Sequence, residues 1–536
     1  MKNIVLLITD TFRYDNLSDR ARRPIRTPAL DAFSQQRGTS IEGFHTGSFP
    51  TIPHRTDVAS GKLVWPHFPW QPIDLSSRNH VARLLGKQGY ISQLICDCPH
   101  LFNARFQQSF TAAFQHRGQE GDKHLLHLND EIPVVMPHEK TRQVPSFQGS
   151  TLADAHRWIN RNVVTEAGTF SARTAATTVQ WLEENYQASP FFLWVDFFDP
   201  HEPWDAPEYL VKRYDPAYDG TPMIHCNYGP ATDYTDAELH NLWAHYAAEA
   251  ELVDRHLGSV LQKIDDLELW DDTIVVITSD HGTSIGEHNR TGKSNICEHD
   301  QRFWPIYPEV SHVPFLIGGG EIPRGASLEL LAQPIDILPT VAELAGVGLE
   351  PRQPIEGISF ASCLRNEKES HRKLSVTGGF IKPTAEGTVP PESTTPWITD
   401  GRWGFAPVGH DGRAELFDLS ADPLAEQNIA NDHPEVVRAL LDEDEKKPIL
   451  GARVFATIAE CENLGLDVSE WIGARLIDYV SPQDTMYADF NLPYEPWAAL
   501  TLEAECLLFP GLLPWTSFRA RYRRNQSPIS NDTARA

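Results

Sequence analysis

Two uninterrupted apolar segments, residues 3–9 and 273–279, run directly into the acidic residues Asp10 and Asp280. Apolar runs of this length, without polar alternation, are typical of strands buried on both faces of a parallel sheet. Between them, the apolar side chains of residues 236–266 recur with the 3.6-residue period of an amphipathic helix. This alternation predicts an α/β fold, in which helices cover both faces of a central, mostly parallel sheet.

Acidic and imidazole side chains follow these predicted strands directly. Sheets of this kind form their sites at the carboxyl ends of the strands, so Asp10, Asp280 and His281 are expected to lie together. Two carboxylates and one imidazole suit a single divalent cation, either Mn²⁺, Zn²⁺, Ca²⁺ or Mg²⁺. Mn²⁺ and Zn²⁺ are slightly favoured, and Thr51 is the expected fourth ligand.

Thr51 is the candidate nucleophile. Pro50 and Pro53 stiffen the backbone around it, and residues 56–61 predict a helix that runs away from it. Thr51 would then lie at a helix N-terminus, where backbone amides favour an oxyanion. Arg55, one turn later, can hold phosphate or sulfate oxygens with its forked guanidinium group. A hydroxyl group needs a metal ion to ionise near neutral pH.

Four further side chains are candidates for binding the substrate and for catalysis. Lys293 lies on the loop after Asp280, and His201 follows the apolar segment 190–198. Both are predicted to neutralise charge on the transferred group. His100 is a second candidate for proton transfer to the leaving group, beside His201. His312, just before another predicted strand, is a candidate for substrate binding.

A chain of 536 residues is too long for one ordinary core. Residues 1–375 predict the catalytic α/β domain, with a polar, irregular insertion at 110–165. Residues 376–440 predict a small antiparallel subdomain, and residues 441–536 a helical and irregular C-terminal extension. That extension is a candidate surface for self-association into a homo-oligomer.

The net charge of the chain indicates which partners it disfavours, and its cysteines indicate the cellular compartment. The formal net charge is −27, which disfavours binding to nucleic acid and to anionic membranes. The seven cysteines are scattered and odd in number, which is typical of reduced thiols in a cytosol. The apolar run at the N-terminus is shorter than that of a signal peptide. We therefore expect a cytoplasmic protein that acts on a small anionic ester.

Three motifs resemble those of the sulfatase branch of the alkaline phosphatase superfamily. They are TIPHR at 51–55, DPHEPW at 199–204 and TSDHGTSIGEHNRTGK at 278–293. In order and spacing the resemblance covers roughly residues 1–430. It implies an alkaline-phosphatase-like sandwich, metal ligation by the acids and the histidine of the last motif, and contact of Lys293 with the transferred group.

Three positions depart from the sulfatase pattern. Thr51 replaces the cysteine or serine that becomes formylglycine, and threonine cannot form that aldehyde. Thr11 replaces the second of two adjacent acids. Cys98 stands where sulfatases have a lysine two residues before a histidine. These differences favour ordinary phosphoryl chemistry, in which water releases a covalent Thr51 intermediate.

The sequence therefore predicts a metal-dependent hydrolase of phosphate mono- or diesters or phosphonate esters. One alternative is a sulfatase that works without formylglycine. Another is a two-metal phosphodiesterase or a phosphoryl-group transferase, for which Asp196, Asp199, His201 and His312 are further candidate ligands. A third is a catalytically silent binding protein, which the joint presence of Thr51, Arg55 and the metal ligands disfavours.

Overall fold

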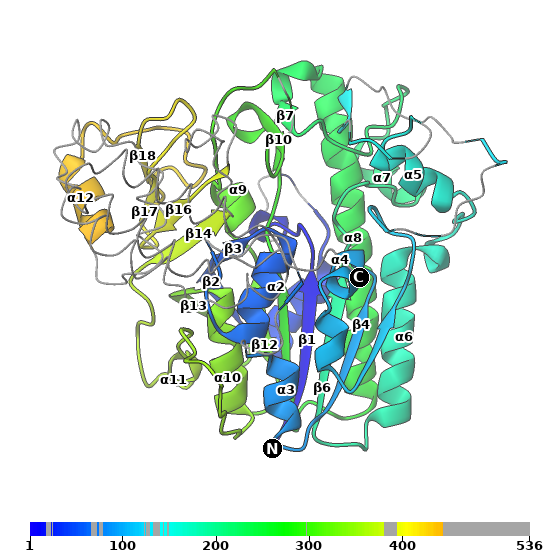
Figure 1. Ribbon diagram of the computed structural model, residues 1–536, viewed down its shortest axis with the longest axis vertical. Coiled ribbons are helices and arrows are strands. Elements are labelled where there is room, and N and C mark those ends of the chain that lie inside the picture. The colour runs from blue at the N-terminus through cyan, green and yellow to red at the C-terminus, as the bar shows by residue number, and fades with distance from the viewer. Residues whose placement is uncertain are drawn as a thin grey trace, which may run out of the picture. The chain divides into compact units, whose positions relative to one another are not determined.

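A computed structural model gives the fold of the chain (Figure 1). It describes residues 1–17, 23, 25–65, 72–73, 79–122, 124, 129–131, 140–142, 144–146, 149–295, 297, 299–379 and 394–442. Residues 380–393, and all but the first two residues of the predicted extension 441–536, lie outside this description.

The main sheet has eight strands in the order β13-β2-β12-β8-β1-β6-β4-β5. All neighbours pair in parallel except β12, which is antiparallel to both β8 and β2. The mostly parallel sheet predicted from the sequence is thereby confirmed. Its strands are β1 (Asn3–Thr9), β2 (Gly38–Phe44), β4 (Ile91–Cys96), β5 (Ala112–Gln115), β6 (Phe191–Phe197), β8 (Thr273–Ser279), β12 (Phe315–Gly318) and β13 (Ala326–Ala332).

The register of the three central strands brings their carboxyl ends to one edge. Thr9 of β1 lies opposite both Phe197 of β6 and Ser279 of β8. The residues that follow these strands, including Asp10 and Asp280, therefore leave the sheet side by side. This register is the geometric basis of the site described below.

Helices cover the sheet on both faces (Figure 1). Val5 and Leu7 of β1 belong to a core that also contains residues of α1, α6 and α8. Trp194 points to the other face, where its ring meets Phe106 and Phe110. The helices are α1 (Pro28–Gln36), α2 (Thr51–Ser60), α3 (Val81–Gly86), α4 (Pro99–Asn103), α5 (Leu152–Ile159), α6 (Phe170–Asn185), α7 (Glu208–Tyr214), α8 (Asp236–Asp266), α9 (Pro308–Ser311), α10 (Ile337–Leu344), α11 (Ala361–Leu364) and α12 (Pro434–Asp442).

The longest of these helices, α8, follows its predicted range of 236–266. Thr235 begins it with a capping box, because its hydroxyl accepts from the Glu238 amide while the Glu238 carboxylate accepts from the Thr235 amide. Within the described part of the chain, no helix is both long and apolar enough to cross a bilayer.

A second, mainly antiparallel sheet confirms the smaller C-terminal sheet expected from the sequence. Its order is β18-β17-β16-β14-β3, and its last strand comes from the N-terminal part of the chain. Because β3 pairs with β14, this sheet holds the segment just before Thr51. The strands are β3 (Ser48–Phe49), β14 (Ser375–Gly379), β16 (Trp397–Thr399), β17 (Trp403–Ala406) and β18 (Glu415–Asp418).

Two short sheets complete the described part. One has the order β7-β10-β9, and β10 delivers Lys293. The other pairs β11 with β15. Their strands are β7 (Gly229–Pro230), β9 (Ser284–Ile285), β10 (Arg290–Gly292), β11 (Trp304–Pro305) and β15 (Thr394–Thr395).

The start of the predicted insertion at 110–165 joins the main sheet, because β5 pairs in parallel with β4 at the sheet edge. Farther along, Thr151 caps α5 through a second capping box. The irregular insertion expected from the sequence therefore contains a regular strand and a regular helix.

We expect Leu7→Ala to lower the free energy of unfolding by about 2–5 kcal/mol, because it empties a fully buried position in the central strand. Val164 is 85% exposed, so the matched control Val164→Ala should change that energy by less than about 0.5 kcal/mol. Urea unfolding followed by tryptophan fluorescence measures both. Equal midpoints for the two variants would contradict the central position of β1.

Candidate active site

The side chains of Asp10, Asp280 and His281 meet at the carboxyl ends of β1 and β8. All three are fully buried, and one ligand atom from each lies within 4.8 Å of the others. His281 Nε2 lies 3.4 Å from Asp280 Oδ2 and 3.9 Å from Asp10 Oδ1. The structure thus brings together the three side chains that the sequence predicts as metal ligands.

The donor atoms of this cluster fit a divalent cation. His281 Nδ1 lies 3.0 Å from the Gly282 carbonyl oxygen, to which it donates, so Nε2 presents its lone pair to the cluster. Burial, and then Lys293, lower the pKa of His281 to about 3, which keeps the ring neutral. Among the described residues, His281 Nε2 has no hydrogen-bond partner. A buried polar atom without a partner is costly, and a bound cation would satisfy it.

Thr11 connects both carboxylates to Lys293. Its amide donates to Asp280 Oδ1 at 3.0 Å, and its hydroxyl donates to Asp10 Oδ1 at 2.8 Å. The same hydroxyl accepts from Lys293 Nζ at 3.2 Å. Thr11 adopts a φ of 69°, a conformation that is strained for a β-branched residue. From the sequence, Thr11 could be recognised only as the replacement of an acid. Its hydrogen bonds could not be predicted, because they depend on a backbone conformation that no local pattern indicates.

Arg55 is fully buried among three carboxylates. Its Nε and Nη2 donate to the two oxygens of Asp196 at 3.1 and 2.9 Å. Its Nη1 lies 3.1 Å from Asp10 Oδ2 and also donates to Asp280. Burial alone would lower the Arg55 pKa, but Asp196, Asp280 and Asp10 hold it well above its usual value. The guanidinium group therefore positions the acids, and its predicted contact with substrate stays a prediction.

Thr51 begins α2 and is 1% exposed. Arg55 Nη1 lies 3.4 Å from the Thr51 carbonyl oxygen while it also contacts Asp10 and Asp280. A single nitrogen atom thus touches the backbone of Thr51 and two of the predicted metal ligands. The first residue of α2 therefore lies beside the predicted metal ligands, as a nucleophilic role for Thr51 would require.

Lys293 is held by a buried acid that the sequence analysis did not select. Its Nζ lies 3.4 Å from Glu202, whose carboxylate also accepts from the Tyr228 hydroxyl. Burial alone would raise the Glu202 pKa, but His201 and Lys293 hold it well below its usual value. Glu202 stands inside the DPHEPW motif, so the motif itself could have identified it.

His201 and His100 both contact the ring of Phe198. The His201 ring stacks on it at 4.0 Å, and the His100 ring meets it edge-on at 5.6 Å. His201 Nδ1 lies 2.6 Å from the Glu202 carbonyl oxygen, to which it donates, and this leaves Nε2 for another partner. Burial, and then His201, lower the pKa of His100 to about 4, so His100 is neutral at pH 7.

A second charged network lies beside Glu202. The Glu120 carboxylate lies 3.2 Å from His225 Nε2 and 3.7 Å from Arg142. Although burial raises it, His225 and Arg142 bring the Glu120 pKa down to about 2. The Arg142 guanidinium lies 4.8 Å from the centre of the Tyr228 ring. No local pattern marks these residues in the sequence.

His312 lies in a ring stack, between Tyr14 at 3.7 Å and His45 at 4.6 Å. Its Nε2 donates to the Glu42 carbonyl oxygen, at 2.6 Å. These contacts give the ring a packing role, and substrate binding by His312 stays a prediction. Asp199, a candidate ligand for a second metal ion, accepts from Gln119 and from Ser171, at 2.7 and 2.6 Å.

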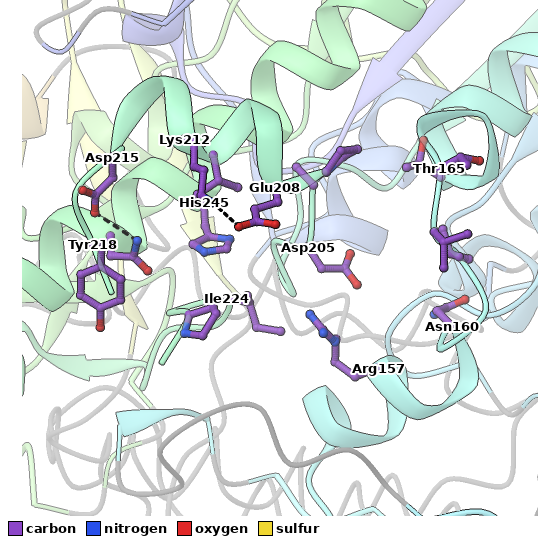
Figure 2. Close-up of a pocket in the computed structure, with 18 of the residues that line it drawn as sticks. Arg157, Asn160, Thr165, Asp205, Glu208, Lys212, Asp215, Tyr218, Ile224 and His245 are labelled. Atoms are coloured by element: carbon purple, nitrogen blue, oxygen red, sulfur yellow. Dashed lines mark hydrogen bonds and ion pairs between the residues drawn. The ribbon is translucent and has the colours of Figure 1, made fainter. Parts of the chain in front are cut away.

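Figure 2 shows a separate cavity of about 580 Å³ beside α7 and α8. Its wall carries both signs of charge, including Arg157, Asp205, Glu208 and Lys212. Asp205 follows the DPHEPW motif directly. None of the nine residues predicted for catalysis or ligand binding lines this cavity in the described part of the chain, so it is distinct from the Asp10 cluster.

Comparison of the sequence with known proteins finds similar proteins among the sulfatases. Mouse arylsulfatase K is 23% identical over 470 residues, which are 82% of this chain and 78% of that protein. Human arylsulfatase K is 29% identical over 464 residues, 82% of this chain and 80% of the relative. Choline-sulfatase of Rhizobium meliloti is 27% identical over 259 residues, 45% of this chain and 46% of the relative.

Solved structures show the same fold. The phosphonate monoester hydrolase of Agrobacterium radiobacter aligns with a TM-score of 0.62 at 22% identity, over 82% of this chain and 94% of that structure. The enzyme from Silicibacter pomeroyi aligns with a TM-score of 0.60 at 21% identity, over 82% and 93%. The sequence model of the Sulfatase family matches residues 2–347. This chain therefore belongs to the Sulfatase family, as a hydrolase of sulfuric or phosphonic esters with the alkaline-phosphatase-like fold.

Proposed function

We propose that this protein hydrolyses phosphate mono- or diesters or phosphonate esters, with unmodified Thr51 as the nucleophile. The observation that carries the proposal is the position of Thr51, which begins α2 and shares Arg55 Nη1 with Asp10 and Asp280. Threonine cannot become the aldehyde of formylglycine enzymes. A hydroxyl group at this place must attack the transferred group itself.

Asp10, Asp280 and His281 would hold one divalent cation. When bound, such a cation supplies Lewis-acid chemistry, lowering the pKa of a hydroxyl group and drawing charge from an ester oxygen. Mn²⁺ and Zn²⁺ remain slightly favoured over Ca²⁺ and Mg²⁺, because the set contains one neutral imidazole nitrogen.

The covalent step exchanges one phosphorus–oxygen bond for another. Thr51 Oγ releases its proton to solvent and attacks phosphorus, the bond to the leaving oxygen breaks, and the imidazolium form of His201 gives that oxygen a proton. Water then attacks phosphorus, its hydroxyl group stays on the acid product, and its proton returns to Thr51 Oγ as the Thr51–phosphorus bond breaks. His201 is suited to the proton transfer because Nδ1 is engaged and Nε2 is left for the substrate.

Lys293 would neutralise charge on the transferred group, since its Nζ is aimed at the cluster through Thr11. Glu202 holds this ammonium group within a buried pair. The pair limits the net positive charge at that point.

A sulfatase that acts without formylglycine is the second candidate, and the sulfatase relatives favour it. A two-metal enzyme is less well supported. Asp196 is engaged by Arg55 and Trp194, and Asp199 by Gln119 and Ser171. Neither acid therefore has the free oxygens that a second cation would need.

The nucleophile is tested by replacing Thr51. Because the covalent step needs its hydroxyl group, Thr51→Ala should lower kcat for a nitrophenyl phosphate ester by about a thousandfold or more. Thr51→Ser keeps the hydroxyl group and should retain measurable turnover. Mass spectrometry of acid-quenched wild-type enzyme should find phosphate on the peptide that contains Thr51.

The same experiment, run with the sulfate ester of the same leaving group, separates the two candidate functions. Higher kcat/KM for the phosphate or phosphonate ester supports the proposal. A clear preference for the sulfate ester would favour the sulfatase alternative. Full turnover by Thr51→Ala with either ester would exclude Thr51 as the nucleophile.

The cation site is tested by thermal unfolding. Mn²⁺ at 100 times its Kd should stabilise wild-type protein by about 2.7 kcal/mol, because it binds only the folded chain. Asp280→Asn should lose most of this effect. Asp272 is an exposed acid just before the same strand β8, and Asp272→Asn should respond like wild type. Equal responses of all three proteins would contradict cation binding at Asp280.

The proton donor is tested by comparing leaving groups. His100, with a pKa of about 4, is neutral at pH 7, and the Nε2 atom of His201 is left for the substrate, so we expect His201 to be the donor. His201→Gln should lower kcat/KM by about 10²–10⁴-fold for alkyl esters and much less for nitrophenyl esters. A larger loss for alkyl esters in His100→Gln than in His201→Gln would reverse the assignment.

A further inference from the structure

A second group of metal-binding side chains shares no residue with the first. It consists of Asp233, Cys297 and His299, whose ligand atoms also lie within 4.8 Å of one another. His299 Nε2 is 3.1 Å from Asp233 Oδ2 and 3.7 Å from Cys297 Sγ. The three side chains come from two segments, the turn at 231–233 and the loop that follows Lys293.

The spacing of these atoms is close to that around a tetrahedral zinc ion, although the His299 ring has to turn to aim a nitrogen at the ion. Zinc binds thiolate sulfur at about 2.3 Å and imidazole nitrogen or carboxylate oxygen at about 2.0–2.1 Å, which places sulfur and nitrogen about 3.6 Å apart and nitrogen and oxygen about 3.3 Å apart. The observed separations are 3.7 and 3.1 Å. We propose that Asp233, Cys297 and His299 bind a Zn²⁺ ion, with solvent at the fourth position.

The chemistry of the donors distinguishes this site from the catalytic cluster. A thiolate and an imidazole favour zinc over Mg²⁺, Ca²⁺ or Mn²⁺, whereas the Asp10 cluster is richer in oxygen. The two sites should therefore accept different cations. This difference allows each site to be filled separately in an experiment.

The His299 ring must turn to receive the ion. Cys297 Sγ is almost equally far from the two ring nitrogens, at 3.6 and 3.7 Å, so it is in line with neither. The same geometry is unsuited to a thiol activated by an imidazole base, because that arrangement needs a direct hydrogen bond. The His299 side chain is 62% exposed, so its ring can rotate without disturbing packed neighbours.

Neighbouring residues already hold the other two ligands in place. Asn227 Nδ2 donates to Asp233 Oδ2 at 2.7 Å, which is the kind of outer contact that orients a ligating carboxylate. Gly229 lies against Cys297, and a Cβ atom at position 229 would come within 2.6 Å of the sulfur. Glycine at this position therefore allows Cys297 to approach the turn at 231–233.

The zinc ion would brace the segments that support Lys293. Asn227 also accepts from the hydroxyl of Thr291 at 2.5 Å, two residues before Lys293. The next residue, Tyr228, donates to Glu202, the partner of Lys293. An ion bound by the turn and the loop would therefore stabilise both the segment that leads to Lys293 and the segment whose Tyr228 contacts Glu202. We assign it a structural role, which does not depend on the ester that is cleaved.

Cobalt spectroscopy tests the site, because thiolate–Co²⁺ bonds absorb strongly in the near ultraviolet. The full-length protein is stripped with chelator, saturated with Mn²⁺ at the oxygen-rich cluster, and titrated with Co²⁺. Wild type should develop the thiolate band and lose it when Zn²⁺ is added. Cys297→Ala should not develop the band, whereas Cys363→Ala, a buried free cysteine on α11, should behave like wild type.

Alkylation of Cys297, followed by peptide mass spectrometry, gives a second measurement. Zn²⁺ should protect Cys297 in wild type, and His299→Ala should need about 10–100-fold more Zn²⁺ for the same protection. His299 is exposed, so this variant should fold. Equal alkylation with and without Zn²⁺ would overturn the proposal. A Co²⁺ band that survives in Cys297→Ala and disappears in Cys98→Ser would also overturn the proposal. The thiolate ligand would then be Cys98, which is buried within the electrostatic influence of Arg55 and Asp10.

Discussion

The pairing of Arg55 with Asp10, Asp196 and Asp280 is the interaction on which the rest of the site depends. All four side chains are fully buried, and three carboxylates in such a place would repel one another strongly without a cation. Removing one partner from a buried ion pair typically costs about 3–5 kcal/mol, because a charge is left uncompensated. Arg55 supplies one positive charge, so the cluster keeps an excess of negative charge. A divalent cation at Asp10 and Asp280 would balance that excess.

The two sheets fix the position of Thr51 relative to these acids. The main sheet delivers Asp10 and Asp280 through the register of β1 with β8. The smaller sheet holds β3, and β3 ends two residues before Thr51. A residue so close to a paired strand has little freedom to move, which a nucleophile at this position would need, because small displacements of a reacting group cost large factors in rate. The smaller sheet therefore supports the candidate active site although it supplies none of the predicted ligands.

The sequence predicts the parts of the fold whose apolar side chains recur with a regular local period. The helix expected at 236–266 has the same bounds in the structure, because its apolar stripe and its capping box are both local signals. Strand β5 at the sheet edge was missed, since its alternate residues are exposed and it carries no apolar run. Asp196 shows the same limit in the site. Its bidentate contact with Arg55 joins residues 141 positions apart in the sequence, and no local pattern indicates such a contact.

Thr11 stands where sulfatases have a second acid, and its hydrogen bonds give this position a defined role in the site. A second acid there would add negative charge to a cluster that already holds three buried carboxylates. Thr11 instead gives a hydrogen bond to each of the two acids predicted to bind the metal, and accepts one from Lys293. These bonds persist in spite of an unfavourable φ of 69°, and such strain survives only where the surrounding contacts determine it. The lower negative charge would leave a bound cation a stronger electrophile, which is what the proposed attack by an unmodified threonine hydroxyl would need.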